Sequence, residues 1–122
     1  MDEITDSVEN GEKIEKASEA WKTSEKYGDL VKLVRLVRNN LEYRIDLHRI
    51  LRKQYGDRIT VYRGGRARTK GYTSVTPSRR AASRFAEWRG GGLRQFSIDT
   101  NKVLAAVSTM EMELIVRVMD LR

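Results

Sequence analysis

The sequence predicts an α+β fold in which N-terminal helices are followed by a small mixed β-sheet core with one further helix. Up to about residue 55, apolar residues recur every three or four positions, as on one face of a helix. Beyond Gly56-Asp57 the pattern changes to short β-type runs separated by glycine and proline. A chain of 122 residues is long enough for one domain with one modest core.

The first helix is expected from Glu12 to about Tyr27, where the apolar residues have helical spacing. These residues are Ile14, Ala17 and Trp21. Residues 1–11 are expected to form an acidic, flexible lead that ends at Gly11. The folded domain is therefore expected to span residues 12–122.

A longer helix is expected after Gly28 and Asp29, which suit a C-cap followed by an N-cap. Its apolar face consists of residues three or four positions apart: Leu30, Val34, Val37, Leu41, Ile45, His48 and Leu51. The Asn39-Asn40 pair is a potential break within it. Because His48 falls on the apolar face, we expect a core or interface residue and not a catalytic one.

The second half is expected to contain short strands and one helix. The predicted strands are Ile59–Tyr62, Gly71–Thr76, Leu93–Ile98, Val103–Val107 and Glu113–Met119. Pro77 ends the second of them, and Ser78 is suited to cap the helix that follows. The helix would precede the glycines 90–92 and carry Ala81, Ala82, Phe85 and Trp88.

The composition excludes several kinds of site. Cysteine is absent and histidine occurs once, so a disulfide framework, a thiolate nucleophile and a Cys-based zinc site are impossible, and a serine-type triad is unsupported. We expect no metal. No apolar run approaches the roughly 20 residues of a membrane span. A soluble protein without membrane partners is expected.

The charge is positive and unevenly distributed. The net charge is +7, with −5 on residues 1–20 and +12 on the rest. No acid occurs between Asp57 and Glu87, a stretch that contains eight basic residues. Such a field attracts a phosphate-bearing small molecule, a nucleic acid or an acidic partner, although a basic solvated surface would have the same composition.

Three short segments contain residues suited to chemistry, and the first is Ile59–Gly65. Alternation places Arg63 on the same strand face as Ile59 and Val61. A guanidinium in line with an apolar face favours an anion beside it, and a phosphate suits its fork geometry. A strand end that points Arg63 to water is the alternative.

The second segment is Gly71–Ser78. Tyr72, Ser74 and Thr76 share one strand face, which offers an aromatic surface and two hydroxyls for a nucleotide pocket. Ordinary strand propensity would explain the same residues, because tyrosine and threonine favour strands in any case.

The third segment is Ser108–Val116. Met110, Met112 and Leu114 continue one apolar face, while Glu111 and Glu113 share the other, about 6.6 Å apart along the strand. Two neighbouring carboxylates can separate their roles into charge stabiliser and proton acceptor, as the cleavage of a bond to an anomeric carbon requires. A solvated acidic edge is the alternative.

Taken in this order, the segments resemble the Arg–Ser–Glu class of mono-ADP-ribosyltransferases, which includes bacterial toxins and phage-encoded effectors. The matching residues are Tyr62-Arg63-Gly64, Tyr72-Thr73-Ser74-Val75-Thr76 and Glu111-Met112-Glu113. The similarity covers roughly residues 28–118. It implies an ADP-ribosyltransferase type of core and an enzyme that consumes NAD+ as a substrate and transfers ADP-ribose to a protein acceptor.

The resemblance also implies residue roles. Catalysis would depend on Arg63, Ser74, Glu111 and Glu113, and NAD+ binding on Tyr62, Arg63, Gly64, Tyr72, Ser74 and Thr76. Arg63 would hold the NAD+ phosphate or the adjoining ribose, and Ser74 would orient Glu113. Glu113 would stabilise the positive ribose, and Glu111 would position the acceptor. A glutamate at that position goes with arginine as acceptor in the family.

The sequence departs from the family pattern in two places. Val75 replaces a residue that often bears a hydroxyl, and only nine residues follow Glu113. Two alternatives remain: hydrolysis of NAD+ or transfer to nucleic acid, and a non-enzymatic, basic nucleic-acid-binding module. The resemblance implies action in the cytoplasm of a bacterial host or target cell.

Overall fold

The computed structural model describes residues 3–65, 70–107 and 113–121. Within them the chain has the predicted α+β class, with four helices and two small sheets. Every strand pair described is antiparallel, so the expected mixed sheet is wrong for this part of the chain. Among the described residues, no helix is both long and apolar enough to cross a membrane.

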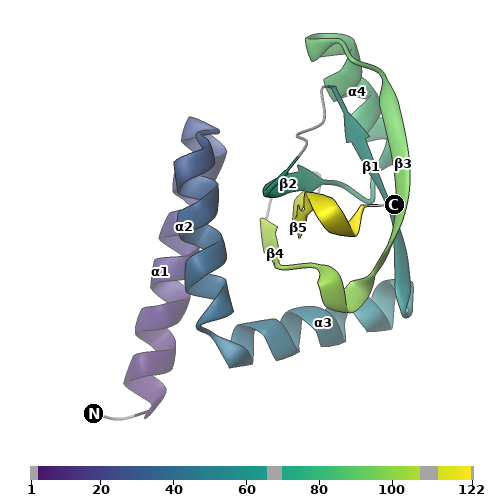
Figure 1. The fold of residues 1–122 in the computed structure, drawn as a ribbon. Coiled ribbons are helices and arrows are strands. Elements are labelled where there is room, and N and C mark those ends of the chain that lie inside the picture. Colours follow the sequence, from purple (N-terminus) through teal and green to yellow (C-terminus); the bar gives the residue numbers. More distant parts are fainter. Residues whose placement is uncertain (1–2, 66–69, 108–112, 122) are drawn as a thin grey trace.

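The described residues up to Tyr55 are mainly helical. The helices are α1 (Glu3–Ser24), α2 (Tyr27–Arg38) and α3 (Leu41–Tyr55). Helices α1 and α2 lie side by side and antiparallel, and α3 turns from the end of α2 toward the strands (Figure 1). This arrangement places the α1–α2 pair against one side of the strand region.

The expected break at Gly11 is wrong, because α1 begins at Glu3 and continues through Gly11. A glycine inside a helix costs only about 1 kcal/mol relative to alanine. The three buried residues Ile14, Ala17 and Trp21, which pack in a core with residues of α2, outweigh that cost. The expected boundary rested on Gly11 alone, and a single glycine does not interrupt this helix.

The turn between the first two helices is also displaced from its expected position. Glu25 has φ 54°, and the turn lies at Glu25 and Lys26, while Gly28 and Asp29 belong to the first turn of α2. The hydroxyl of Ser24 donates to the Asp29 carboxylate and accepts from the backbone N of Lys26 at 3.1 Å. These local bonds replace the expected glycine cap.

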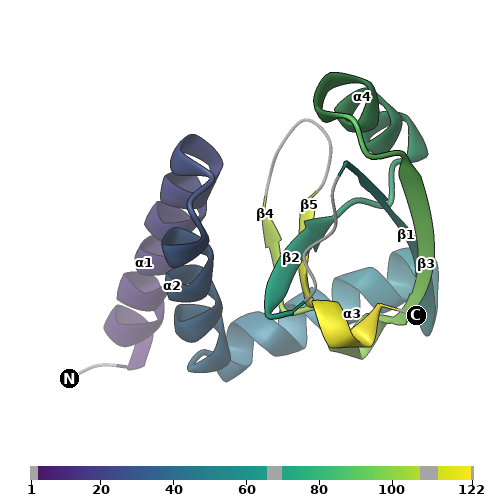
Figure 2. The same ribbon diagram turned by 45° about the horizontal axis from the view of Figure 1, so that its top comes forward.

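The potential break at the Asn39-Asn40 pair is confirmed, so the longer predicted helix is two helices. Asn40 caps α3, since its Oδ1 accepts a hydrogen bond from the backbone N of Tyr43 at 2.9 Å. An asparagine side chain satisfies an N–H group that the start of a helix leaves without a partner. After this change of direction α3 runs toward the strands, and Figure 2 shows it behind their lower ends.

The strands form two sheets. Strands β1 (Arg58–Gly64) and β3 (Leu93–Asp99) pair with each other, and β2 (Tyr72–Val75), β5 (Glu113–Arg117) and β4 (Ala105–Val107) form a three-stranded sheet with β5 in the centre. The sheets meet where Tyr62 of β1 pairs with Thr76, which directly follows β2. Short 3₁₀ turns occupy Thr100–Lys102 and Val118–Asp120.

Helix α4 (Arg79–Arg89) begins where the sequence predicts, with Ser78 Oγ accepting from the backbone N of Ala81 at 3.1 Å. It packs against β1 at Gly64. A Cβ at residue 64 would lie 2.0 Å from the carbonyl oxygen of Ala82 and 2.7 Å from the backbone N of Ala86. Only glycine therefore allows α4 to approach the strand this closely.

The core consists of two clusters on opposite faces of the three-stranded sheet. Ile115 packs with residues of α1 and α2, whereas Leu114 and Val116 pack with residues of α3 and β1. All three side chains are fully buried. The central strand β5 is thus apolar on both faces over these residues.

Candidate functional site

Arg63 lies near the end of β1, on the strand face that also carries the buried Ile59 and Val61. Its side chain is half-buried, and Nη1 donates a 2.8 Å hydrogen bond to the carbonyl oxygen of Ser74. The predicted alternation of β1 is confirmed. The alternative, in which Arg63 merely points to water, is wrong, because the guanidinium reaches across to β2.

Ser74 lies on β2 with the predicted parity. Tyr72 and Ser74 are half-buried on one face, while Thr73 and Val75 are buried on the other. Ser74 is opposite Ile115 in the sheet, so its side chain is on the face of Ile115, toward α1 and α2. The hydroxyl is therefore on the same side of the sheet as the N-terminal helices.

Glu113 is the first residue of β5 and is half-buried. It is two residues from Ile115, so it shares a face with Ser74 and is its diagonal neighbour across the strand pair. Such neighbours lie about 7 to 8 Å apart, within reach of a long side chain. Arg63 thus contacts the backbone carbonyl of Ser74, and Glu113 shares the sheet face of the Ser74 side chain. Arg63 itself lies on the strand face of Ile59 and Val61, which pack with Leu114 and Val116 on the opposite side of the three-stranded sheet.

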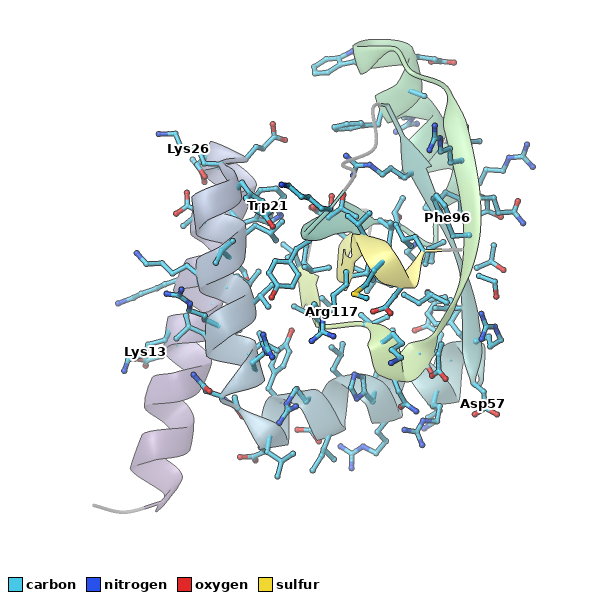
Figure 3. All side chains as sticks on the ribbon, viewed as in Figure 1. Lys13, Trp21, Lys26, Asp57, Phe96 and Arg117 are labelled. Carbon is cyan, nitrogen blue, oxygen red and sulfur yellow. The ribbon has the colours of Figure 1, made fainter. Side chains whose placement is uncertain are left out.

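Trp21 is a site residue that sequence reasoning missed. Its indole Nε1 donates a 3.0 Å hydrogen bond to Oε1 of Glu113. Trp21 is only 8% exposed and lies between the α1–α2 pair and the sheet (Figure 3). The sequence identifies Trp21 as a core residue, but its spacing on α1 carries no signal of a polar contact with the other end of the chain.

Tyr72 and Thr76 both make contacts within the fold. The backbone N of Tyr72 donates to the hydroxyl of Tyr27 at 3.1 Å, and the ring packs against the helix-side core. Thr76 Oγ1 accepts from the backbone N of Ser78 at 3.0 Å and so shapes the turn into α4. These contacts give both residues a structural role, and their predicted part in NAD+ binding stays a prediction.

Tyr62 and Gly64 flank Arg63 on β1. Two backbone hydrogen bonds join Tyr62 to Thr76, at 2.7 and 3.0 Å. Gly64 is buried beneath α4, so the close approach that it permits there is that of a helix. Their predicted contacts with NAD+ also stay predictions.

Glu111 and the methionines beside it lie outside the described residues, so the predicted pairing of the two glutamates stays a prediction. Among the described residues, no group of three or more histidine, aspartate or glutamate side chains could hold a metal ion. His48 has a structural contact, with Nε2 2.8 Å from the carbonyl oxygen of Val103.

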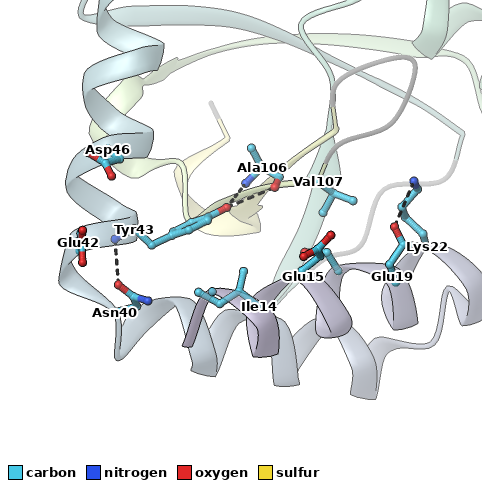
Figure 4. A pocket seen from close by; sticks show the side chains of 12 residues that line it. Ile14, Glu15, Glu19, Lys22, Asn40, Glu42, Tyr43, Asp46, Ala106 and Val107 are labelled. Carbon is cyan, nitrogen blue, oxygen red and sulfur yellow. Dashed lines mark hydrogen bonds and ion pairs between the residues drawn. The ribbon is translucent and has the colours of Figure 1, made fainter. Parts of the chain in front are cut away.

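A pocket of about 530 Å³ lies between α1, α3 and β4, on the side of the three-stranded sheet that also carries Ser74 and Glu113 (Figure 4). Its lining includes four acids, Glu15, Glu19, Glu42 and Asp46, and one lysine, Lys22. Arg63, Ser74 and Glu113 do not line it. Because these acids would repel the pyrophosphate that the resemblance predicts, we place the candidate site at Arg63, Ser74 and Glu113 and not at this pocket.

Tyr43 is one of the residues that line that pocket. Its hydroxyl donates to the carbonyl oxygen of Ala106 at 3.3 Å and accepts from the backbone N of Ala106 at 3.1 Å. Burial raises the pKa of Tyr43 above its ordinary value of 10.0, and the hydrogen bond to Ala106 opposes that rise. The ring thus joins α3 to the edge strand β4.

Comparison of the chain with family models, curated proteins and solved structures gives no match. The case for a function therefore rests on the residues and their arrangement.

Proposed function

We propose that the protein is a mono-ADP-ribosyltransferase that cleaves the nicotinamide–ribose bond of NAD+ and transfers ADP-ribose to an arginine of a protein acceptor. The observation that supports this best is that Arg63 and Glu113 are both neighbours of Ser74 in the structure. Arg63 donates to Ser74, and Glu113 occupies the same sheet face as Ser74. These are the residues that the family resemblance assigns to one site.

The charges of these residues fit the substrate. NAD+ carries a negative pyrophosphate at its centre and a ribose that becomes positive as nicotinamide leaves. Arg63 supplies a cation for the phosphate, in a stretch without acids from residue 58 to residue 86. Glu113 supplies an anion for the ribose. The two residues thus supply the two charges that the substrate requires.

The reaction that follows is a substitution at the anomeric carbon of the ribose. The bond from this carbon to the nicotinamide nitrogen breaks, and its electron pair stays with nicotinamide. A guanidine nitrogen of the acceptor forms the new bond and loses one proton, which Glu111 or water accepts. Glu113 stabilises the positive charge on the ribose while neither bond is complete, and removal of such a stabilising group costs about 3 kcal/mol of barrier.

Trp21 acts on this step through Glu113. The indole N–H holds one carboxylate oxygen, which limits the rotation of the glutamate side chain. A group that is fixed before the reaction does not have to be reoriented when charge develops. Trp21 is therefore a positioning residue in this proposal, contributed by a helix that precedes the three segments of the resemblance.

The proposal is tested with NAD+ labelled in its adenylate half, incubated with bacterial lysate proteins and with a peptide that contains arginine. Wild type should release nicotinamide and label the acceptor, and Glu113→Gln should lose at least a hundredfold of that rate, as for loss of an oxyanion-hole donor. Glu12→Gln, which removes an exposed carboxylate of α1, is the matched control and should retain the rate.

Two results would count against the proposal. Release of nicotinamide without any labelled acceptor would make the protein an NAD+ glycohydrolase. Failure of the wild-type protein to consume NAD+ would remove the enzymatic function altogether.

A further inference from the structure

Helix α4 exposes an aromatic side chain that the fold does not use. Trp88 is 88% exposed, and Phe85, three residues earlier on the same helix, is 41% exposed. Residues three apart are neighbours on a helix surface. The opposite face of α4 already packs on β1 through the buried Ala82. Trp88 is therefore on the outer side of α4, whereas Phe85, whose ring lies close to Gly65, is at the edge between that side and the face that packs on β1.

Arginines continue this outer face. Arg80, Arg84 and Trp88 are four residues apart and form one stripe, and all three are exposed. At 1.5 Å per residue, successive members of the stripe are about 6 Å apart along the helix. We call Arg80, Arg84, Phe85 and Trp88 the α4 platform. The one acid of the helix, Glu87, lies at the side of this stripe.

The α4 platform combines guanidinium groups with aromatic rings, and few ligands bind well to both. Arginines bind phosphates, and an exposed indole offers a flat surface for stacking. A membrane surface would require a continuous apolar face on the helix, whereas arginines make up half of this platform. Nucleic-acid bases that are not paired present both a free π-face and a phosphate at each nucleotide.

We infer that the α4 platform binds single-stranded nucleic acid, with a base stacked on Trp88 and phosphates held by Arg80 and Arg84. The net charge of +12 beyond residue 20 supplies the attraction over longer distances. This inference does not depend on the proposed enzymatic activity, because none of its residues belongs to the candidate site.

The experiment is a titration of fluorescein-labelled oligothymidylate with the full chain, followed by anisotropy at several salt concentrations. Trp88→Ala should weaken binding about tenfold, in the range found for loss of one base–aromatic stack. Trp88→Phe should restore most of the affinity. Trp88 is on the surface and makes no core contact, so these variants should fold like wild type.

The arginines are tested by their effect on salt dependence. Arg80→Ala with Arg84→Ala should reduce the slope of log affinity against log salt by about 0.7 for each phosphate that the two arginines neutralise. The matched control is Arg52→Ala with Lys53→Ala, which removes the same charge from exposed positions on α3. The control should change the slope less.

Three outcomes would overturn the inference. Equal weakening by the α3 and α4 double variants would show that only the overall charge binds the oligonucleotide. Unchanged affinity of Trp88→Ala would exclude stacking. Binding to vesicles of anionic phospholipid without oligonucleotide binding, with a blue shift of tryptophan emission that Trp88→Phe abolishes, would assign the platform to a membrane surface.

Discussion

The indole of Trp21 and the carboxylate of Glu113 are joined by a 3.0 Å hydrogen bond, although 92 positions separate the two residues in the sequence. The bond connects helix α1 to the first residue of strand β5. It also fixes the side chain to which the proposal assigns stabilisation of the positive ribose. The arrangement of the N-terminal helix and the activity of the site should therefore depend on each other.

Trp21→Phe keeps an aromatic ring but removes the N–H donor. We expect kcat for NAD+ turnover to fall about tenfold, or roughly 1.4 kcal/mol, with a smaller change in the KM for NAD+. Tyr43→Phe is the control, because it removes the two hydrogen bonds between α3 and the sheet at Ala106 but does not touch Glu113. Similar losses of kcat in both variants would mean that Trp21 has only a structural role.

Gly64→Ala should strongly destabilise the fold. The added Cβ would lie 2.0 Å from a backbone oxygen of α4, so β1 and α4 would have to separate. Overpacking of this kind costs about 1–3 kcal/mol and more where backbone must move, and we expect the upper end. Urea unfolding followed by circular dichroism measures the change, and a midpoint equal to that of wild type would contradict the packing described for α4.

Gly11→Ala should have the opposite effect. Residue 11 lies inside α1, has no positive φ, and an added Cβ would meet nothing within 4 Å. Alanine has the higher helix propensity and loses less backbone entropy, so we expect the free energy of unfolding to rise by about 0.5–1 kcal/mol. A fall in the same urea experiment would mean that the helix does not continue through residue 11.

Tyr43 predicts a dependence of stability on alkaline pH. Because burial raises its pKa, the folded chain retains the phenolic proton at pH values where the unfolded chain releases it. The associated stability is complete below about pH 10, the ordinary pKa, and is lost as the pH rises through the higher pKa of the folded state. Wild type should therefore lose stability more steeply above that pH than Tyr43→Phe, in unfolding curves measured at a series of pH values.

Much of the fold could be predicted from local patterns. The alternation in β1 and β2 correctly indicated which side chains share a face, and Ser78 correctly marked the start of α4. The errors occurred where contacts between residues far apart in the sequence determine the extent of an element. The packing of Trp21 and its neighbours against α2 stabilises α1 enough for the helix to continue through Gly11. The local sequence around Gly11 gives no sign of this packing.

The candidate site could be predicted only in part, for a related reason. The resemblance named Arg63, Ser74 and Glu113, and the parity of each strand indicated the face of each side chain. It could not indicate that Arg63 contacts the backbone of Ser74, since that depends on the angle at which β1 meets β2. Trp21 was missed because a tryptophan with helical spacing has the same pattern whether or not its N–H has a polar partner.

The contact at Gly64 has a mechanical consequence for its neighbour Arg63. Where β1 passes beneath α4, no side-chain layer separates the two backbones, so there is little soft material to absorb a displacement. A shift of α4 toward or away from the strand should be transmitted to the adjacent guanidinium. The position of α4 should therefore influence the position of the Arg63 guanidinium relative to β2.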